Sequence, residues 1–175
     1  MTQRYLRLQA ALYRVEKLVA ALLMLLISGV VLAGVFSRYL LQEPFFGTDR
    51  LATYLFVVLT FWGIQMASAY QEHITVGVVR HRLSPFWSAI FSAVASLFTA
   101  GFLGYLAWAS YGFVRFLYEG GEKDIVLGLP LWTVYSFFVL AAGVSAVRYF
   151  IGTFLWVAVV RGKLLPEAFQ KKVLV

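Results

Sequence analysis

The sequence contains no cysteine and few charged residues, and both shortages limit what the protein can be. Without thiols the chain has no disulfide framework, no thiolate metal site and no cysteine nucleophile. Charged residues make up 13% of the 175 residues, whereas soluble domains average about a quarter. Hydrophobic residues make up 62%, and the mean hydropathy is +0.82. A core of this size cannot bury so much apolar surface, so the composition predicts an integral membrane protein.

Four long apolar stretches predict an all-α fold with four transmembrane helices in a single membrane domain over residues 1–175. About 20 apolar residues are needed to cross a hydrocarbon core as a helix. The third stretch lies in a charge-free run over 83–114, which as a helix would measure about 48 Å. We therefore expect this helix to tilt, to project from the bilayer or to break. The expected spans are residues 18–37, 51–70, 86–114 and 130–160.

The first 17 residues predict an amphipathic helix lying in the membrane interface. Apolar residues recur on one helical face and arginines lie on another, which is typical of interfacial helices. A charged cap that continues directly into the next helix is an alternative. A signal peptide is a second alternative for the basic start and apolar run.

The positions of Lys and Arg predict the orientation. Four spans place both termini on one side of the membrane, together with the second loop, residues 72–83. That side is the more basic: it holds Arg4, Arg7, Arg14, Lys17, Arg80, Arg82, Arg161, Lys163, Lys171 and Lys172, against Arg38, Arg50, Arg115 and Lys123 on the other. Because cytoplasmic loops are enriched in Lys and Arg, we expect both termini to be cytoplasmic. The net charge of +7 is then a membrane feature and predicts no nucleic-acid partner.

Arg148 is the one charge inside the predicted spans, and such charges often have a function. It lies about 27 Å along the fourth helix, close to the cytoplasmic face. We interpret it as a side chain that extends to lipid headgroups. The alternative is a buried ion pair with Glu119, Glu122 or Asp124, or with a carboxylate of another subunit.

Small residues at four-residue spacing predict where helices pack closely. One pair, Gly63 and Ala67, lies beside Trp62 in the second span, and a ladder of small residues runs along the third span. The candidate subunit-interface residues are Trp62, Gly63, Ala67, Ser92, Ser96, Ala100 and Gly104.

Polar residues mark the corners of the second span. Thr48 or Asp49 can cap its start, and Arg50 follows them. We interpret Arg38, Glu72, His73 and Arg148 as structural corners or lipid-headgroup contacts.

No motif for catalysis, metal or cofactor binding is apparent. The chain lacks a P-loop, GxGxxG and a GxSxG motif, so we expect no enzyme. His73 and His81 could be haem ligands, which makes a four-helix haem-binding subunit of a membrane oxidoreductase the alternative function. Their spacing of eight residues is not that of two ligands on one helical turn. A small self-assembling transporter is a third hypothesis.

A series of short motifs resembles the DctQ-type small membrane subunit of TRAP (tripartite ATP-independent periplasmic) transporters. The similarity covers roughly residues 15–155, with one acid, Asp49, where the family often has two and Ala141 where it often has proline. The motifs are Ser37-Arg38-Tyr39, Leu51-Ala52, Phe61-Trp62-Gly63, Glu72-His73-Ile74-Thr75-Val76, Arg80-His81-Arg82-Leu83-Ser84-Pro85 and Leu127-Gly128-Leu129-Pro130-Leu131-Trp132, followed by Gly143 and Arg148.

The resemblance implies an accessory subunit of the bacterial or archaeal inner membrane. It would brace a large, elevator-type DctM subunit, which would carry the substrate and the sodium ions. A periplasmic solute-binding protein would deliver an organic anion, a carboxylate or a sulfonate, and an ion gradient would drive uptake. Thr48, Asp49 and Arg50 are the candidate periplasmic docking residues for that protein. The expected partners of the chain are these two proteins and membrane lipids, with no cofactor in the chain itself.

Overall fold

Four long helices make up most of the protein. The structure, a computed structural model, describes residues 2–43, 45–70 and 85–161. The helices are α1 (Thr2–Phe36), α2 (Thr48–Tyr70), α4 (Pro85–Glu119) and α5 (Leu131–Val160), and a π-helical turn, η1 (Ser37–Leu41), extends α1. All four are long and apolar enough to cross a membrane. The predicted all-α fold with four membrane-spanning helices is confirmed.

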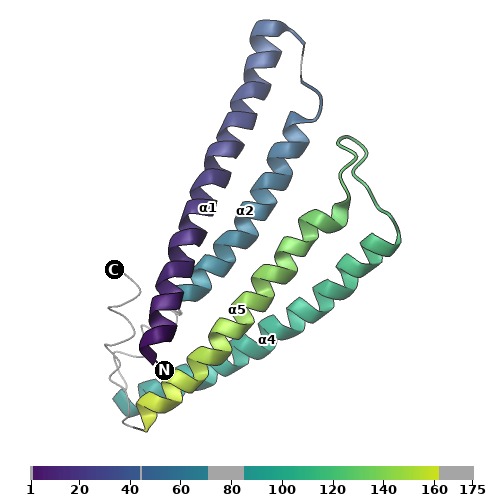
Figure 1. The fold of residues 1–175 in the computed structure, drawn as a ribbon. Coiled ribbons are helices and arrows are strands. Elements are labelled where there is room, and N and C mark those ends of the chain that lie inside the picture. The colour runs from purple at the N-terminus through teal and green to yellow at the C-terminus, as the bar shows by residue number, and fades with distance from the viewer. Residues whose placement is uncertain (1, 44, 71–84, 162–175) are drawn as a thin grey trace.

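The helices form an open row in which each one contacts its neighbour. The extensive contacts are between α1 and α2, between α2 and α5, and between α5 and α4. Figure 1 shows the order α1–α2–α5–α4 in the upper part of the view, and lower down α4 passes behind α5. The chain alternates in direction, so one end of the row holds the start of α1 and the end of α5. The connections 37–47 and 120–130 lie at the opposite end (Figure 1). We call these the N-terminal end and the loop end.

The first helix differs from the prediction of a separate amphipathic helix over residues 1–17. Instead α1 is continuous from Thr2 to Phe36, and the part that can span a membrane begins at Ala11. The first glycine of the chain is Gly29 and the first proline is Pro44. Because nothing earlier breaks the helical hydrogen bonds, the alternative of a cap continuous with the next helix is correct.

The third predicted span is also longer than expected and does not break. Helix α4 contains 35 residues, or about 52 Å, and ends at Glu119, beyond the predicted position 114. Arg115 lies in its last turns and donates a hydrogen bond of 2.7 Å to Glu119, one turn later. An exposed pair at this spacing keeps both charges compatible with the helix. The other two spans shift by three residues or fewer, to Thr48 for α2 and to Leu131 for α5.

Small residues pack α4 against α5. In the ladder on α4, Ser92, Ser96 and Ala100 are buried and Gly104 is half-buried, and the extensive neighbour of α4 among the described helices is α5. The buried small residues of α4 are Ser88, Ala89, Ser92, Ala93, Ser96 and Ala100. Helix α5, which contacts both α4 and α2, buries Ala141, Ala142, Ser145 and Gly152. Ser92, Ser96 and Ala100 were predicted to contact another subunit, and this prediction is wrong. Small side chains let two helices approach closely, and here the partner helix belongs to the same chain.

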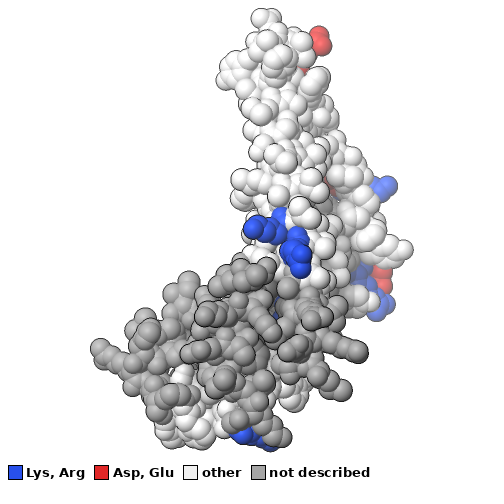
Figure 2. All heavy atoms as spheres, turned by 60° about the vertical axis from the view of Figure 1, so that its left-hand side comes forward, with Lys and Arg blue, Asp and Glu red and all other residues white. Residues whose placement is uncertain are grey.

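The surface of the described residues has few charges. Figure 2 shows one face of the molecule with a tall, almost uncharged upper part and with Lys and Arg side chains lower down. Exposed large apolar side chains occur along all four helices. In a water-soluble protein such a surface would aggregate, whereas in a bilayer it faces lipid or another membrane protein.

Candidate functional site

A buried polar cluster joins three helices near the N-terminal end of the row. It consists of Glu16 on α1, Trp62 and Gln65 on α2, and Arg148 on α5. Glu16 and Arg148 are each 4% exposed and Gln65 is 8% exposed, while Trp62 is half-buried. These four residues are called the polar cluster below.

Hydrogen bonds in the polar cluster converge on Glu16. Arg148 donates from Nη2 to Glu16 Oε1 and from Nη1 to the carbonyl oxygen of Gln65 at 2.8 Å. Gln65 Nε2 donates to the same Glu16 oxygen at 2.9 Å, and Trp62 Nε1 donates to the backbone carbonyl of Glu16 at 2.9 Å. A buried charge is tolerated only when it is paired and hydrogen-bonded. Here two buried charges, those of Glu16 and Arg148, pair with each other.

Arg148 therefore differs from its predicted role as a lipid-headgroup contact. Its side chain is enclosed by the chain and pairs with Glu16. The alternative of a buried ion pair names the right type of contact but the wrong carboxylates, Glu119, Glu122 and Asp124. Those residues lie beyond the opposite end of α5, about 27 Å away along the helix.

The depth of the residues in the membrane is the signal that could have identified Glu16. Helices α1 and α5 run in opposite directions, so the start of α1 lies level with the end of α5. Glu16 is close to the start of the first apolar stretch and Arg148 is about 18 residues into the last. Because the prediction assigned Glu16 to an interfacial helix, Glu16 was not among the predicted partners of Arg148.

A second polar group lies at the loop end. Asp124, 8% exposed, accepts a hydrogen bond of 2.6 Å from the hydroxyl of Tyr54 on α2. Its other carboxylate oxygen accepts from the backbone N–H groups of Val126 and Leu127 at 3.0 and 2.8 Å. Arg50 lies 3.8 Å away. These contacts tie the α4–α5 connection to the first turns of α2.

The same contacts change the acidity of Asp124. The hydrogen bond from Tyr54 contributes most to lowering the pKa of its carboxyl group, and the backbone N–H groups of Leu127 and Val126 and the charge of Arg50 lower it further. Partial burial opposes them. Hydrogen bonds to the ionised form favour that form, so Asp124 is held as a carboxylate.

The start of α2 differs from the predicted cap. Thr48 and Asp49 lie inside the first turn, and Gly47 precedes it with its carbonyl accepting from Leu51 N–H at 2.9 Å. The hydroxyl of Thr48 donates to the Phe45 carbonyl, so it does not cap the helix. Gly47 has φ +85, and a Cβ there would lie 2.5 Å from Leu127 Cδ2. Only glycine fits this conformation and this space.

The remaining predicted corner residues have different outcomes. Arg38 follows α1 in the π-helical turn and donates to Asp49 at 3.2 Å, with both side chains exposed. Arg50 lies beside Asp124. Glu72, His73 and His81 lie outside the described residues. Within residues 2–43, 45–70 and 85–161, no group of three or more His, Cys, Asp or Glu could hold a metal ion.

One face of α2 is open. Gly63 and Ala67 are exposed, and a Cβ on Gly63 would meet nothing within 4 Å. Thr53, Phe56 and Thr60 continue the exposed stripe toward the loop end. Positions 53, 56, 60, 63 and 67 recur every three or four residues, so they share one helical face. We call this stripe the open α2 face.

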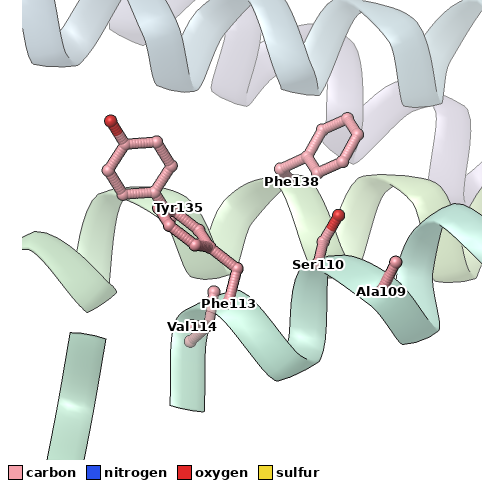
Figure 3. A pocket seen from close by; sticks show the side chains of 6 residues that line it. All are labelled: Ala109, Ser110, Phe113, Val114, Tyr135 and Phe138. Atoms are coloured by element: carbon pink, nitrogen blue, oxygen red, sulfur yellow. The ribbon is translucent and has the colours of Figure 1, made fainter. Parts of the chain in front are cut away.

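An apolar hollow lies between α4 and α5. Its volume is about 260 Å³, and Figure 3 shows the six side chains that line it. They are Ala109, Ser110, Phe113, Val114, Tyr135 and Phe138. No charged side chain belongs to this lining, so the hollow suits a hydrocarbon group better than an ionic substrate.

Comparisons with known proteins agree with this arrangement of membrane helices. The family model of the DctQ component of tripartite ATP-independent periplasmic transporters matches residues 27–159. The ectoine TRAP transporter small permease protein TeaB of Halomonas elongata is 28% identical over 136 residues, which cover 78% of this chain and 70% of that protein.

The chain is therefore a multi-pass membrane protein of the transporter class. It belongs to the DctQ family of TRAP transporter components. It is a small permease subunit of the inner membrane, and its family is one of transporters. The resemblance inferred from the short motifs is confirmed.

Proposed function

We propose that this chain braces the large membrane subunit of a TRAP transporter and does not itself form the transport path. The observation that carries this proposal is the open order of helix contacts, α1–α2–α5–α4, in which the described residues of α1 and α4 make no extensive contact with each other (Figure 1). A closed bundle could enclose polar groups that line a route, whereas a row offers two broad faces. A row can widen and stiffen the fixed part of a moving partner.

The open α2 face supports a contact with the large subunit. Gly63 and Ala67 are exposed, while most of the large exposed apolar side chains of α1 are leucine. Small residues at four-residue spacing permit close approach of a second helix. We propose that a helix of the large subunit packs on this face. Trp62 was predicted to lie at such an interface, but its indole donates a hydrogen bond within the chain.

Replacing Gly63 by leucine tests this contact. The leucine side chain would fill the space that a partner helix needs, and we expect recovery of the large subunit by co-purification to fall about tenfold, equivalent to about 1.4 kcal/mol. The matched control is Gly101→Leu, because Gly101 is also an exposed helical glycine where an added Cβ would meet nothing within 4 Å. Equal recovery with both variants would refute the contact.

We further propose that the complete transporter takes up an organic anion from a periplasmic binding protein, driven by an ion gradient. The related TeaB protein is named as the small permease protein of an ectoine TRAP transporter. Sodium ions and substrate would bind in the large subunit and not in this chain. Uptake of a labelled carboxylate into vesicles should need all three proteins and a sodium gradient. Uptake by this chain alone would overturn the assignment.

Both termini are proposed to be cytoplasmic, because the Lys and Arg residues are concentrated on the terminal side. The natural chain has no cysteine, so a Gly121→Cys variant carries one thiol in the connection at the loop end. A membrane-impermeant maleimide should label it in intact spheroplasts. Labelling only after permeabilisation would reverse the orientation.

A further inference from the structure

The polar cluster covers one side of α2. At 100° per residue, Trp62 and Ser68 lie within about 60° of Gln65 around the helix. Gly63 and Ala67 lie about 160° from Gln65, on the opposite side. Gln65 and Ser68 are buried, whereas Gly63 and Ala67 are exposed.

The contact between Glu16 and Arg148 connects helices that are not neighbours in the row. Helix α2 lies between α1 and α5, and the extensive contacts of α1 are with α2. Glu16 and Arg148 nevertheless meet, and both also bond to Gln65. Helices α1 and α5 must therefore approach each other over the Gln65 side of α2. The row therefore curves, with the Gln65 side of α2 on the inside of the curve and the side with Gly63 and Ala67 on the outside.

We propose that the Glu16–Arg148 pair positions α1 and α5 over one side of α2 and thereby leaves the open α2 face available to the large subunit. This inference rests on the proposed function, because it assigns the open face to that partner. Glu16 and Arg148 are positioning residues: they act on the interface through the arrangement of the helices. Neither touches the partner, since both are buried within the chain.

The spacing between α1 and α5 is the direct test. Spin labels at Leu12→Cys and Phe154→Cys, which are 51% and 62% exposed, report this spacing in the full-length chain in nanodiscs. Only the introduced thiols react, because the natural chain has no cysteine. We expect Glu16→Gln and Arg148→Gln each to lengthen and broaden the distance distribution. The charge-exchanged pair Glu16→Arg with Arg148→Glu should restore much of the narrow distribution.

A second label pair separates local repositioning from general unfolding. Phe102→Cys on α4 and Leu140→Cys on α5 are both exposed and report on the distance between α4 and α5, a pair of helices that the Glu16–Arg148 contact does not join. This distance should stay the same in every variant. An unchanged α1–α5 distance in both single variants would overturn the proposal. Broadening of both label pairs, or no recovery in the charge-exchanged variant, would also overturn it.

Co-purification with the large subunit gives the functional result. Glu16→Gln should reduce recovery about tenfold, and the charge-exchanged variant should regain much of it. Arg115→Gln is the control, because it removes an exposed charge from an ion pair outside the cluster. If Glu16→Gln moves α1 yet retains full recovery, the positioning role is wrong and the proposed function stands. If the natural chain recovers no large subunit, the proposed function fails and the label distances still test the helix arrangement.

Discussion

The two helical hairpins of this protein are held together in different ways. Helices α4 and α5 contact each other along much of their length through small buried residues such as Ala93 and Ala142. Helix α1 is peripheral: only 6% of its most apolar stretch is buried, against 33% for α5. Its contacts include a close approach of Gly34 to Thr48 near the loop end and the polar cluster near the other end.

This difference follows from what can hold helices together in lipid. The hydrocarbon around the helices is as apolar as leucine, so association depends on close packing and on hydrogen bonds. The α4–α5 hairpin uses close packing, and α1 depends more on polar contacts. The α4–α5 hairpin should consequently be the stable part of the molecule, and α1 the part whose position is more easily changed.

The largest effect is expected at a small residue that is buried in α5. Ala142 is 2% exposed, and leucine at this position adds bulk that the interface cannot hold. We expect Ala142→Leu to destabilise the chain by about 1–3 kcal/mol, seen as a lower unfolding temperature in detergent. Val147→Leu is the control, because Val147 is 58% exposed on the same helix. Equal unfolding temperatures for the two variants would show that the hairpin is not closely packed.

A smaller effect is expected where α1 approaches α2. A Cβ on Gly34 would lie 3.0 Å from Thr48 Oγ1, so Gly34→Val should push the helices apart and cost about 1 kcal/mol. Gly29→Val changes the same helix where a Cβ meets nothing within 4 Å. Comparing the two unfolding temperatures removes the effect of valine on the helix itself. A Gly34 variant as stable as the Gly29 variant would contradict a close α1–α2 contact.

The smallest effect is expected from pH, through the contact of Asp124 with α2. The pKa of Asp124 is lowered in the folded chain, chiefly by the Tyr54 hydroxyl, so its contribution to stability is present above the ordinary value of 3.8. It is lost as the pH falls through the lower folded pKa. The unfolding temperature should fall below about pH 4, and less steeply in Asp124→Asn. Identical pH profiles for the two proteins would exclude Asp124 as the cause.

The sequence was a good guide to the helices and a poor guide to their neighbours. Four spans could be predicted because hydropathy acts residue by residue, and the errors were at the ends, as for α1 and α4. The ladder of Ser92, Ser96 and Ala100 correctly indicated close helix packing. It could not identify the partner helix, because a small residue permits any helix to approach.

The same contrast holds for the charged residues of the polar cluster: the sequence indicates that a residue is unusual but does not identify its partner. Arg148 stands out in the sequence as the one charge well inside an apolar stretch. Its partner, Glu16, is 132 residues away and lies among other charges, so nothing local marks it. Likewise, Gly47 is visible in the sequence only as part of a turn, whereas its positive φ and its closeness to Leu127 of another connection appear only in the structure.

The sequence by itself determined that this is a membrane protein with four spanning helices, and its ordered motifs determined the family. Each of these properties depends on residues near one another in the chain. Only the tertiary structure decided the order α1–α2–α5–α4, the pairing of Glu16 with Arg148 and the side of α2 that stays open. These depend on which surfaces meet when distant helices pack, and in lipid that choice is made by shape and hydrogen bonding, since hydrophobicity no longer separates inside from outside.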